Sequence, residues 1–207
     1  ALAGDMAGTI SDASILLVSG SPMLHGFRVA PGVDYVKLPS VTRTVRDGYS
    51  TRSLAMDTDD VFELRANLAL ASIADFRPDV ILVDKKPYGV RNELEGALYY
   101  AKTHLPATSL VLVLRDILDA PEATISAWHS GGYTAAIERL YARVLVLGPP
   151  DVFDMRREYA LPPSVCAKLR FCGYIRRSPG RQSRADLRSQ HGIAADDRLV
   201  LATPRLR

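Results

Sequence analysis

The runs that decide the fold are Val80-Ile-Leu-Val83, Leu110-Val-Leu-Val-Leu114 and Val144-Leu-Val-Leu147. Each run is continuously aliphatic and too short for a helix, and longer amphipathic segments separate one run from the next. Strands that are apolar on both faces and alternate with helices are typical of a parallel sheet covered by helices. The sequence therefore predicts an α/β fold with a doubly wound parallel sheet.

The flanking sequence extends this alternation in both directions. Further strands are expected over 14–18, 33–38 and 169–173. Helices are expected from about Asp59, where Asp57 and Thr58 offer N-caps, and over 91–104, 121–129, 133–142 and 151–159. Residues 40–56 are polar and irregular, which predicts a long loop.

The composition is that of an ordinary globular protein. The chain has 207 residues, of which 47% are hydrophobic and 24% charged, and this excludes collagen-like, coiled-coil and disordered classes. No apolar run approaches the roughly 20 residues of a membrane-spanning helix, and no signal-peptide pattern is visible. The two cysteines, Cys166 and Cys172, are expected to be reduced and buried, which favours the cytoplasm.

The last part of the chain differs in charge from the rest. Residues 176–207 contain eight arginines against three aspartates. Beyond Tyr174 there is no aromatic residue that could stack on a base, so binding to nucleic acid is not expected. Residues 177–182 are interpreted as a linker, followed by a helix over 183–192 and a strand over 198–202. We therefore expect two domains, 1–176 and the beginning of a second one over 177–207.

In open parallel sheets, ligands bind beyond the carboxyl ends of the strands. Four predicted strands are followed there by polar or glycine-containing segments: Ser19-Gly20, Asp84-Lys85, Arg115-Asp116 and Gly148-Pro149. Asp84 could accept a proton from a hydroxyl group, and Lys85 or Arg115 could hold an anion. The structural alternatives stay open at this point: Asp84 could cap the following turn, and Arg115 and Asp116 could form an ion pair.

His25 is a second catalytic candidate, because it follows the first predicted strand in a loop that is expected at the ligand-facing edge. Several familiar motifs are absent from the sequence. It has no P-loop, no GxGxxG after a strand, no GxSxG elbow and no cluster with metal-ligand spacing. The absence of these motifs argues against a dinucleotide-dependent oxidoreductase, a nucleotide triphosphatase, a serine hydrolase and a metal site.

Four strings occur in an order that resembles a known family. They are Leu82-Val-Asp-Lys-Lys-Pro-Tyr-Gly89 with Glu93-Leu94, Leu114-Arg-Asp-Ile-Leu-Asp119, Val146-Leu-Gly-Pro-Pro-Asp-Val-Phe-Asp154 and Phe171-Cys-Gly-Tyr174. Over roughly residues 13–202 the chain resembles predicted bacterial glycosyltransferases of the GT-B fold. That group is related to family 28 and to the peptidoglycan GlcNAc transferase.

The resemblance implies two Rossmann-like domains that face a cleft. The amino-terminal domain, here 1–176, would take the acceptor, and the second would take a nucleotide-sugar donor, with no metal or other cofactor. Asp84, Lys85, Arg115 and Asp116 would shape the acceptor pocket, with Ser19 and Gly20 at its rim. The family's first strand, its loop with the catalytic base and its Gly-rich donor turn have no counterpart in the sequence. We therefore expect a fragment that does not itself catalyse transfer.

Two other functions remain open from the sequence. One is a nucleotide-sugar 2-epimerase, which shares the two-domain architecture and needs no acceptor. The other is a non-catalytic α/β binding or regulatory module. A cytoplasmic location, either free or peripheral to the membrane, is expected for the transferase.

Overall fold

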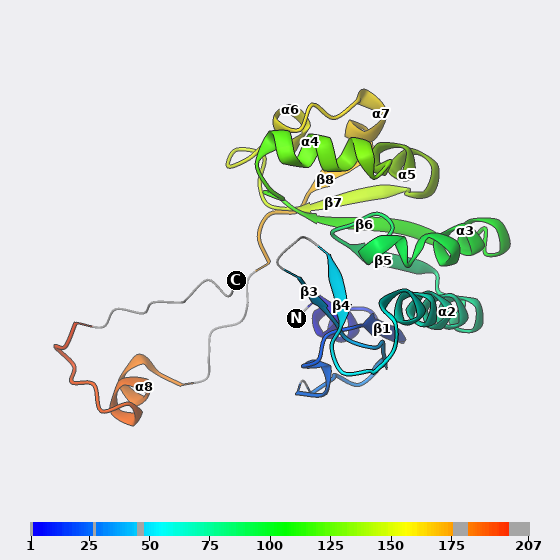
Figure 1. Cartoon of the computed structure of the whole chain (residues 1–207). Helices are drawn as coiled ribbons and strands as arrows, with labels where there is room; N and C mark the ends of the chain where they lie inside the picture. Colours follow the sequence, from blue (N-terminus) through cyan, green and yellow to red (C-terminus); the bar gives the residue numbers. More distant parts are fainter. Residues whose placement is uncertain (1, 27, 45–47, 176–181, 199–207) are drawn as a thin grey trace. The chain divides into compact units, whose positions relative to one another are not determined.

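The computed structural model describes residues 2–26, 28–44, 48–175 and 182–198 (Figure 1). The chain divides into two compact units, Ala1–Ile175 and Arg176–Arg207. The linker expected over 177–182 lies outside the described residues except for residue 182, and the strand expected over 198–202 lies outside them except for residue 198.

The first unit is built on a four-stranded parallel sheet, which confirms the predicted α/β class. Its strands are β5 (Val80–Asp84), β6 (Ser109–Arg115), β7 (Arg143–Leu147) and β8 (Leu169–Phe171), in the spatial order β5-β6-β7-β8. The register pairs Leu82 with Val111 and Val113 with Leu145. The three aliphatic runs thus lie side by side, as their composition predicts.

Helices cover one face of this sheet and form the main core with it. They are α3 (Glu95–His104), α4 (Pro121–Ser130) and α5 (Tyr133–Leu140). Alternate residues of β6 and β7 point into that core, namely Leu110, Leu112, Leu114, Val144 and Val146, and each is almost completely buried. The helices contribute Leu98, Ala101, Trp128, Ala136, Ile137 and Leu140 to the same cluster.

A second, smaller parallel sheet consists of β1 (Ile15–Ser19) and β2 (Val33–Lys37). The 3₁₀ turn η1 (Leu24–Gly26) lies in the connection between them, and the helix α1 (Leu2–Thr9) precedes β1 and contacts β2.

The loop expected over 40–56 contains an antiparallel hairpin, so that expectation was wrong in part. The hairpin joins β3 (Val41–Arg43) to β4 (Tyr49–Thr51), with Val41 opposite Thr51. Each strand has three residues and is mostly polar, so neither produces a recognisable period. Packing of the Tyr49 ring edge against Phe62, with 6.0 Å between centroids, holds the hairpin to its neighbour helix.

That neighbour is α2 (Thr58–Phe76), which begins one residue before the expected start. The Asp57 carboxylate accepts a hydrogen bond from the amide of Asp59 and caps the helix. The negative charges of Asp59 and Asp60 in the first turn interact favourably with the helix dipole. The helix ends at Arg77, which adopts a left-handed conformation.

A buried ion pair joins α2 to the segment after β5. The Arg65 guanidinium donates to Glu93 through Nε at 2.5 Å and Nη2 at 2.8 Å. Its Nη1 atom donates to the carbonyl oxygen of Pro39, which follows β2. Gly20, which follows β1, lies so close to this guanidinium that a Cβ there would overlap it. Arg65 thus contacts segments from both sheets.

The remaining elements close the first unit and form the second. The 3₁₀ turn η2 (Val90–Asn92) precedes α3, and two short helices, α6 (Met155–Glu158) and α7 (Pro163–Cys166), lead to β8. The second unit contains α8 (Arg184–Gln190), where Ser183 and Asp186 form a capping box.

Cys166 and Cys172 are unbridged; Cys172 is exposed, so its predicted burial was wrong. No helix in the described residues has the length and apolarity needed to span a membrane.

Substitution of Arg65 by Met should lower the free energy of unfolding by about 3–5 kcal/mol, because it leaves Glu93 buried without its partner. Glu93→Gln should act in the same direction. Asp59→Asn is the matched control, since it breaks an exposed pair with Arg91 (2.7 Å) and should cost less than about 1 kcal/mol. Urea denaturation measures all three. Equal effects of Arg65→Met and Asp59→Asn would contradict a stabilising role for the buried pair.

Candidate functional site

The carboxyl ends of β5, β6 and β7 are neighbours at one edge of the main sheet. Asp84 is the last residue of β5, Arg115 is the last residue of β6, and Gly148 follows β7. Asp84 is paired with Val113, so Arg115, two residues further on, lies on the same face of the sheet as Asp84. The sheet order therefore brings together residues that are about 30 positions apart in the sequence.

The turn after β5 holds Lys85 in a left-handed conformation, with φ at 68°. The amide of Lys85 donates to Val113 in β6, and the amide of Lys86 donates to Asp84, each at 2.8 Å. The buried hydroxyl of Tyr141 donates to the carbonyl of Pro87 at 2.5 Å and anchors the end of the turn. A non-glycine residue in this conformation is strained, and such strain is concentrated at functional sites.

Three charged side chains at this edge are exposed: Asp84, Lys85 and Arg115. Within the part of the chain that the structure describes, none of them makes a side-chain hydrogen bond or ion pair. Asp84 does not cap its turn, and Arg115 does not pair with Asp116. The two structural alternatives that the sequence left open are thus not what the geometry shows, and the three groups can reach a ligand.

The Asp116 carboxylate forms a hydrogen bond with Tyr174, a residue that the sequence did not mark as part of the site. Its Oδ2 atom accepts a hydrogen bond of 2.6 Å from the hydroxyl of Tyr174, which follows β8. This bond to the carboxylate raises the pKa of Tyr174 above its ordinary value of 10.0. Gly148 lies against Asp116, where a Cβ would come within 2.5 Å of the Asp116 side chain. Asp116 therefore links the ends of β6, β7 and β8.

Ser19 and Gly20 belong to a different cluster at the carboxyl ends of β1 and β2. Gly20 accepts a hydrogen bond of 3.0 Å from Ser40 through its carbonyl oxygen, and Ser40 also accepts one from Lys37 at 3.0 Å. Burial, together with the nearby Arg65 guanidinium, lowers the pKa of Lys37 below its ordinary value. Lys37 and Arg65 were missed because nothing in the sequence marks them as neighbours of Gly20.

His25 lies in the turn η1 that follows β1, and it contacts β2. Its Nδ1 atom is 3.0 Å from the hydroxyl of Tyr35, the central residue of β2, and the two rings meet edge to face. The connection from β1 to β2 has to return along the sheet, because the two strands are parallel, and it carries His25 with it.

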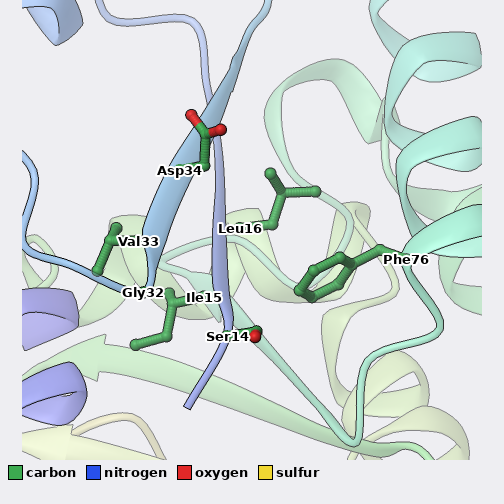
Figure 2. Close-up of a pocket in the computed structure, with 7 residues that line it drawn as sticks. All are labelled: Ser14, Ile15, Leu16, Gly32, Val33, Asp34 and Phe76. Carbon is green, nitrogen blue, oxygen red and sulfur yellow. The ribbon is translucent and has the colours of Figure 1, made fainter. Parts of the chain in front are cut away.

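A hollow of about 320 Å³ lies at the opposite, amino-terminal end of β1 and β2. Figure 2 shows Phe76 of α2 reaching toward Leu16, with Ser14 and Gly32 nearby. Among the described residues that line this hollow, Asp34 is the one with a charged side chain. In the described residues no three or more His, Cys, Asp or Glu side chains gather in a way that could hold a metal ion.

Comparison of the chain with protein-family models, with curated proteins and with solved structures found no match.

Substitution of Asp116 by Asn should lower the pKa of Tyr174 toward 10.0, because the neutral amide no longer stabilises the protonated phenol. The Cζ chemical shift of ¹³C-labelled tyrosine, followed between about pH 8 and 12, measures this change. Asp119→Asn is the control, because the Asp119 carboxylate caps the amide of Ala120 instead. A Tyr174 pKa that is unchanged in Asp116→Asn would show that the bond does not form in solution.

Proposed function

We propose that the first unit is the acceptor-binding domain of a glycosyltransferase that moves a sugar from a nucleotide-sugar donor to a hydroxyl group. The proposal is supported by the four strings that resemble GT-B glycosyltransferases and by the parallel α/β sheet. The observation that carries it is the set of three exposed charges, Asp84, Lys85 and Arg115, at the carboxyl ends of adjacent strands, where no side chain of the described residues pairs with them.

The chemistry of these residues fits an acceptor that has both a hydroxyl and an anionic group. A carboxylate such as Asp84 can accept the proton that the hydroxyl loses as it attacks the sugar. Lys85 offers a compact cation, and the Arg115 guanidinium offers a planar donor fork that matches a phosphate or carboxylate. Asp84 and Arg115 lie on one face of the sheet, so one small molecule can contact both.

The strained turn supports a binding role for Lys85 in particular. The left-handed conformation of Lys85 is maintained by two backbone hydrogen bonds and by the Tyr141 anchor at Pro87. A turn held in this way keeps the position of Lys85 relative to β6 fixed before a ligand arrives. Such preorganisation reduces the entropy lost on binding.

Binding of hexose 1-phosphates to the 207-residue chain tests the proposal, since these molecules combine sugar hydroxyls with a phosphate. Saturation-transfer NMR should detect their binding. Lys85→Ala and Arg115→Ala should each weaken it about tenfold or more, because each removes a charged partner of the phosphate. Asp84→Asn should leave binding in place, because its role is to accept a proton.

Lys102→Ala is the control, because Lys102 is an exposed cation in the last turn of α3. It should bind hexose 1-phosphates as the unaltered chain does. Equal affinities of the Lys85→Ala and Lys102→Ala variants, or binding of UDP-sugars only, would contradict the placement of an acceptor at this edge.

A further inference from the structure

The carboxyl ends of β1 and β2 hold a half-buried lysine, Lys37, in a fixed place. Ser19 and Lys37 are the last residues of the two strands and are register partners, so their side chains lie on the same face of the small sheet. The amide of Leu38 donates to the carbonyl oxygen of Ser19 at 2.9 Å. Further along, the Ser40 hydroxyl donates to the carbonyl oxygen of Gly20 at 3.0 Å. The segments that follow the two strands therefore stay side by side around Lys37.

A second cation, Arg65 of α2, approaches the same cluster. Its guanidinium donates to the carbonyl oxygen of Pro39 and lies against Gly20. The charge of Arg65 is balanced by Glu93, which accepts two hydrogen bonds from it. Burial lowers the pKa of Lys37, and the positive charge of Arg65 lowers it further. The surroundings therefore destabilise the charged form of Lys37.

Lys37 has no acidic partner among the residues that the structure describes. Its Nζ atom donates to the carbonyl oxygen of Leu38 and, at 3.0 Å, to the Ser40 hydroxyl, and both acceptors are neutral. Asp34 is the acidic residue of β2, but it is three positions from Lys37 and so lies on the other face of the strand. An ammonium group has three N–H donors, so one N–H of Lys37 can still reach an acceptor.

Lys168 shows how a lysine with a purely structural role is bound in this protein. Its Nζ atom donates to three carbonyl oxygens at the end of α5, those of Ile137, Glu138 and Tyr141, at 2.9, 2.7 and 2.7 Å. Burial lowers the pKa of Lys168, but the Glu138 carboxylate acts in the opposite direction. Lys168 thus has three acceptors and a negative charge nearby. Within the described part of the chain Lys37 lacks both the third acceptor and the negative charge.

We propose that Lys37 and Ser19 bind the phosphate group of a ligand at the carboxyl ends of β1 and β2. Lys37 donates its third N–H to one phosphate oxygen. The Ser19 hydroxyl accepts from the amide of Ser21 at 3.2 Å and donates to no acceptor among the described residues, so its proton is directed to a second phosphate oxygen. The ligand supplies the negative charge that Lys37 lacks.

The two neighbouring cations favour a phosphate over a carboxylate. A phosphate monoester carries close to two negative charges at neutral pH, and its attraction to Lys37 and to the nearby Arg65 grows with that charge. Arg65 acts through its charge alone, because its guanidinium is already bonded to Glu93 and Pro39. This site is distinct from Asp84, Lys85 and Arg115, and it does not depend on the proposed transferase function.

Titration of the ¹⁵N-labelled 207-residue chain with inorganic phosphate tests the proposal. The amide signals of Ser19, Ser21 and Leu38 should shift in a saturable way. Lys37→Met should weaken this binding at least tenfold, and Lys37→Arg should retain it, because it keeps the positive charge. Absence of a saturable shift at these amides, or equal affinity of the Lys37→Met variant, would overturn the proposal.

Two control variants separate this site from other cations. Lys102→Met removes an exposed cation from the last turn of α3 and should leave the shifts at Ser19 unchanged. Lys85→Ala should also leave them unchanged, even if it abolishes binding of hexose 1-phosphates. Loss of the Ser19 shifts in either control variant would show that phosphate is bound elsewhere.

A measurement on the unaltered chain avoids any effect of substitution on folding. The ¹³Cε chemical shifts of the lysines, followed against pH, should show that saturating phosphate raises the pKa of Lys37, because the bound anion stabilises the ammonium form. The pKa of Lys168 should not change, since its three acceptors belong to the protein. An unchanged pKa of Lys37 would contradict direct contact with phosphate.

Three further probes define the ligand. Acetate should bind at least tenfold more weakly than phosphate, and equal binding of the two would overturn the choice of phosphate. Binding of glycerol 3-phosphate would support the site and assign it to a soluble monoester. Binding of phosphatidic acid vesicles alone would support it and assign it to a lipid headgroup, whereas binding of neither would overturn it.

Discussion

The ion pair between Arg65 and Glu93 connects the parts of the first unit. Both side chains are buried, so each ion depends on the other for the stabilisation that water would otherwise supply. The same guanidinium donates to Pro39 and lies against Gly20, which has no side chain to displace it. One arginine therefore connects α2, the ends of β1 and β2, and the segment after β5.

This arrangement explains why the polar groups of the unit gather at one edge. Parallel strands end on the same side of their sheet, and Arg65 joins Gly20 and Pro39, at the carboxyl ends of β1 and β2, to Glu93 in the segment after β5. Lys37 and Ser40 then form one polar cluster at that edge, and Asp84, Lys85 and Arg115 form another. Asp116 and Tyr174 link the ends of β6 and β8. The proposed acceptor site thus depends on the direction and order of the strands more than on any local motif.

The central strands could be predicted because a continuous aliphatic run is a local signal, and 80–83, 110–114 and 144–147 all carry it. The β3–β4 hairpin could not, because its strands are three residues long and polar. Residues that directly follow a predicted parallel strand could also be predicted to lie at one edge of the sheet, and Asp84 and Arg115 were identified as candidate site residues for this reason. Arg65 and Glu93 are 28 positions apart, and Asp116 and Tyr174 are 58 positions apart. Hydrophobic periodicity predicts local secondary structure, so it cannot predict contacts over such distances in the sequence.

We infer that the Arg65–Glu93 pair holds the β1–β2 sheet to the rest of the first unit. Amide hydrogen exchange of the Glu93→Gln variant tests it most directly, under conditions in which the variant remains folded. We predict that protection falls in Ile15–Ser19 and Val33–Lys37, while Leu110–Leu114 and Val144–Val146 stay protected, because the pair joins the arginine that binds Pro39 after β2 to the segment after β5. A uniform loss of protection across both sheets, or no change in either, would contradict it.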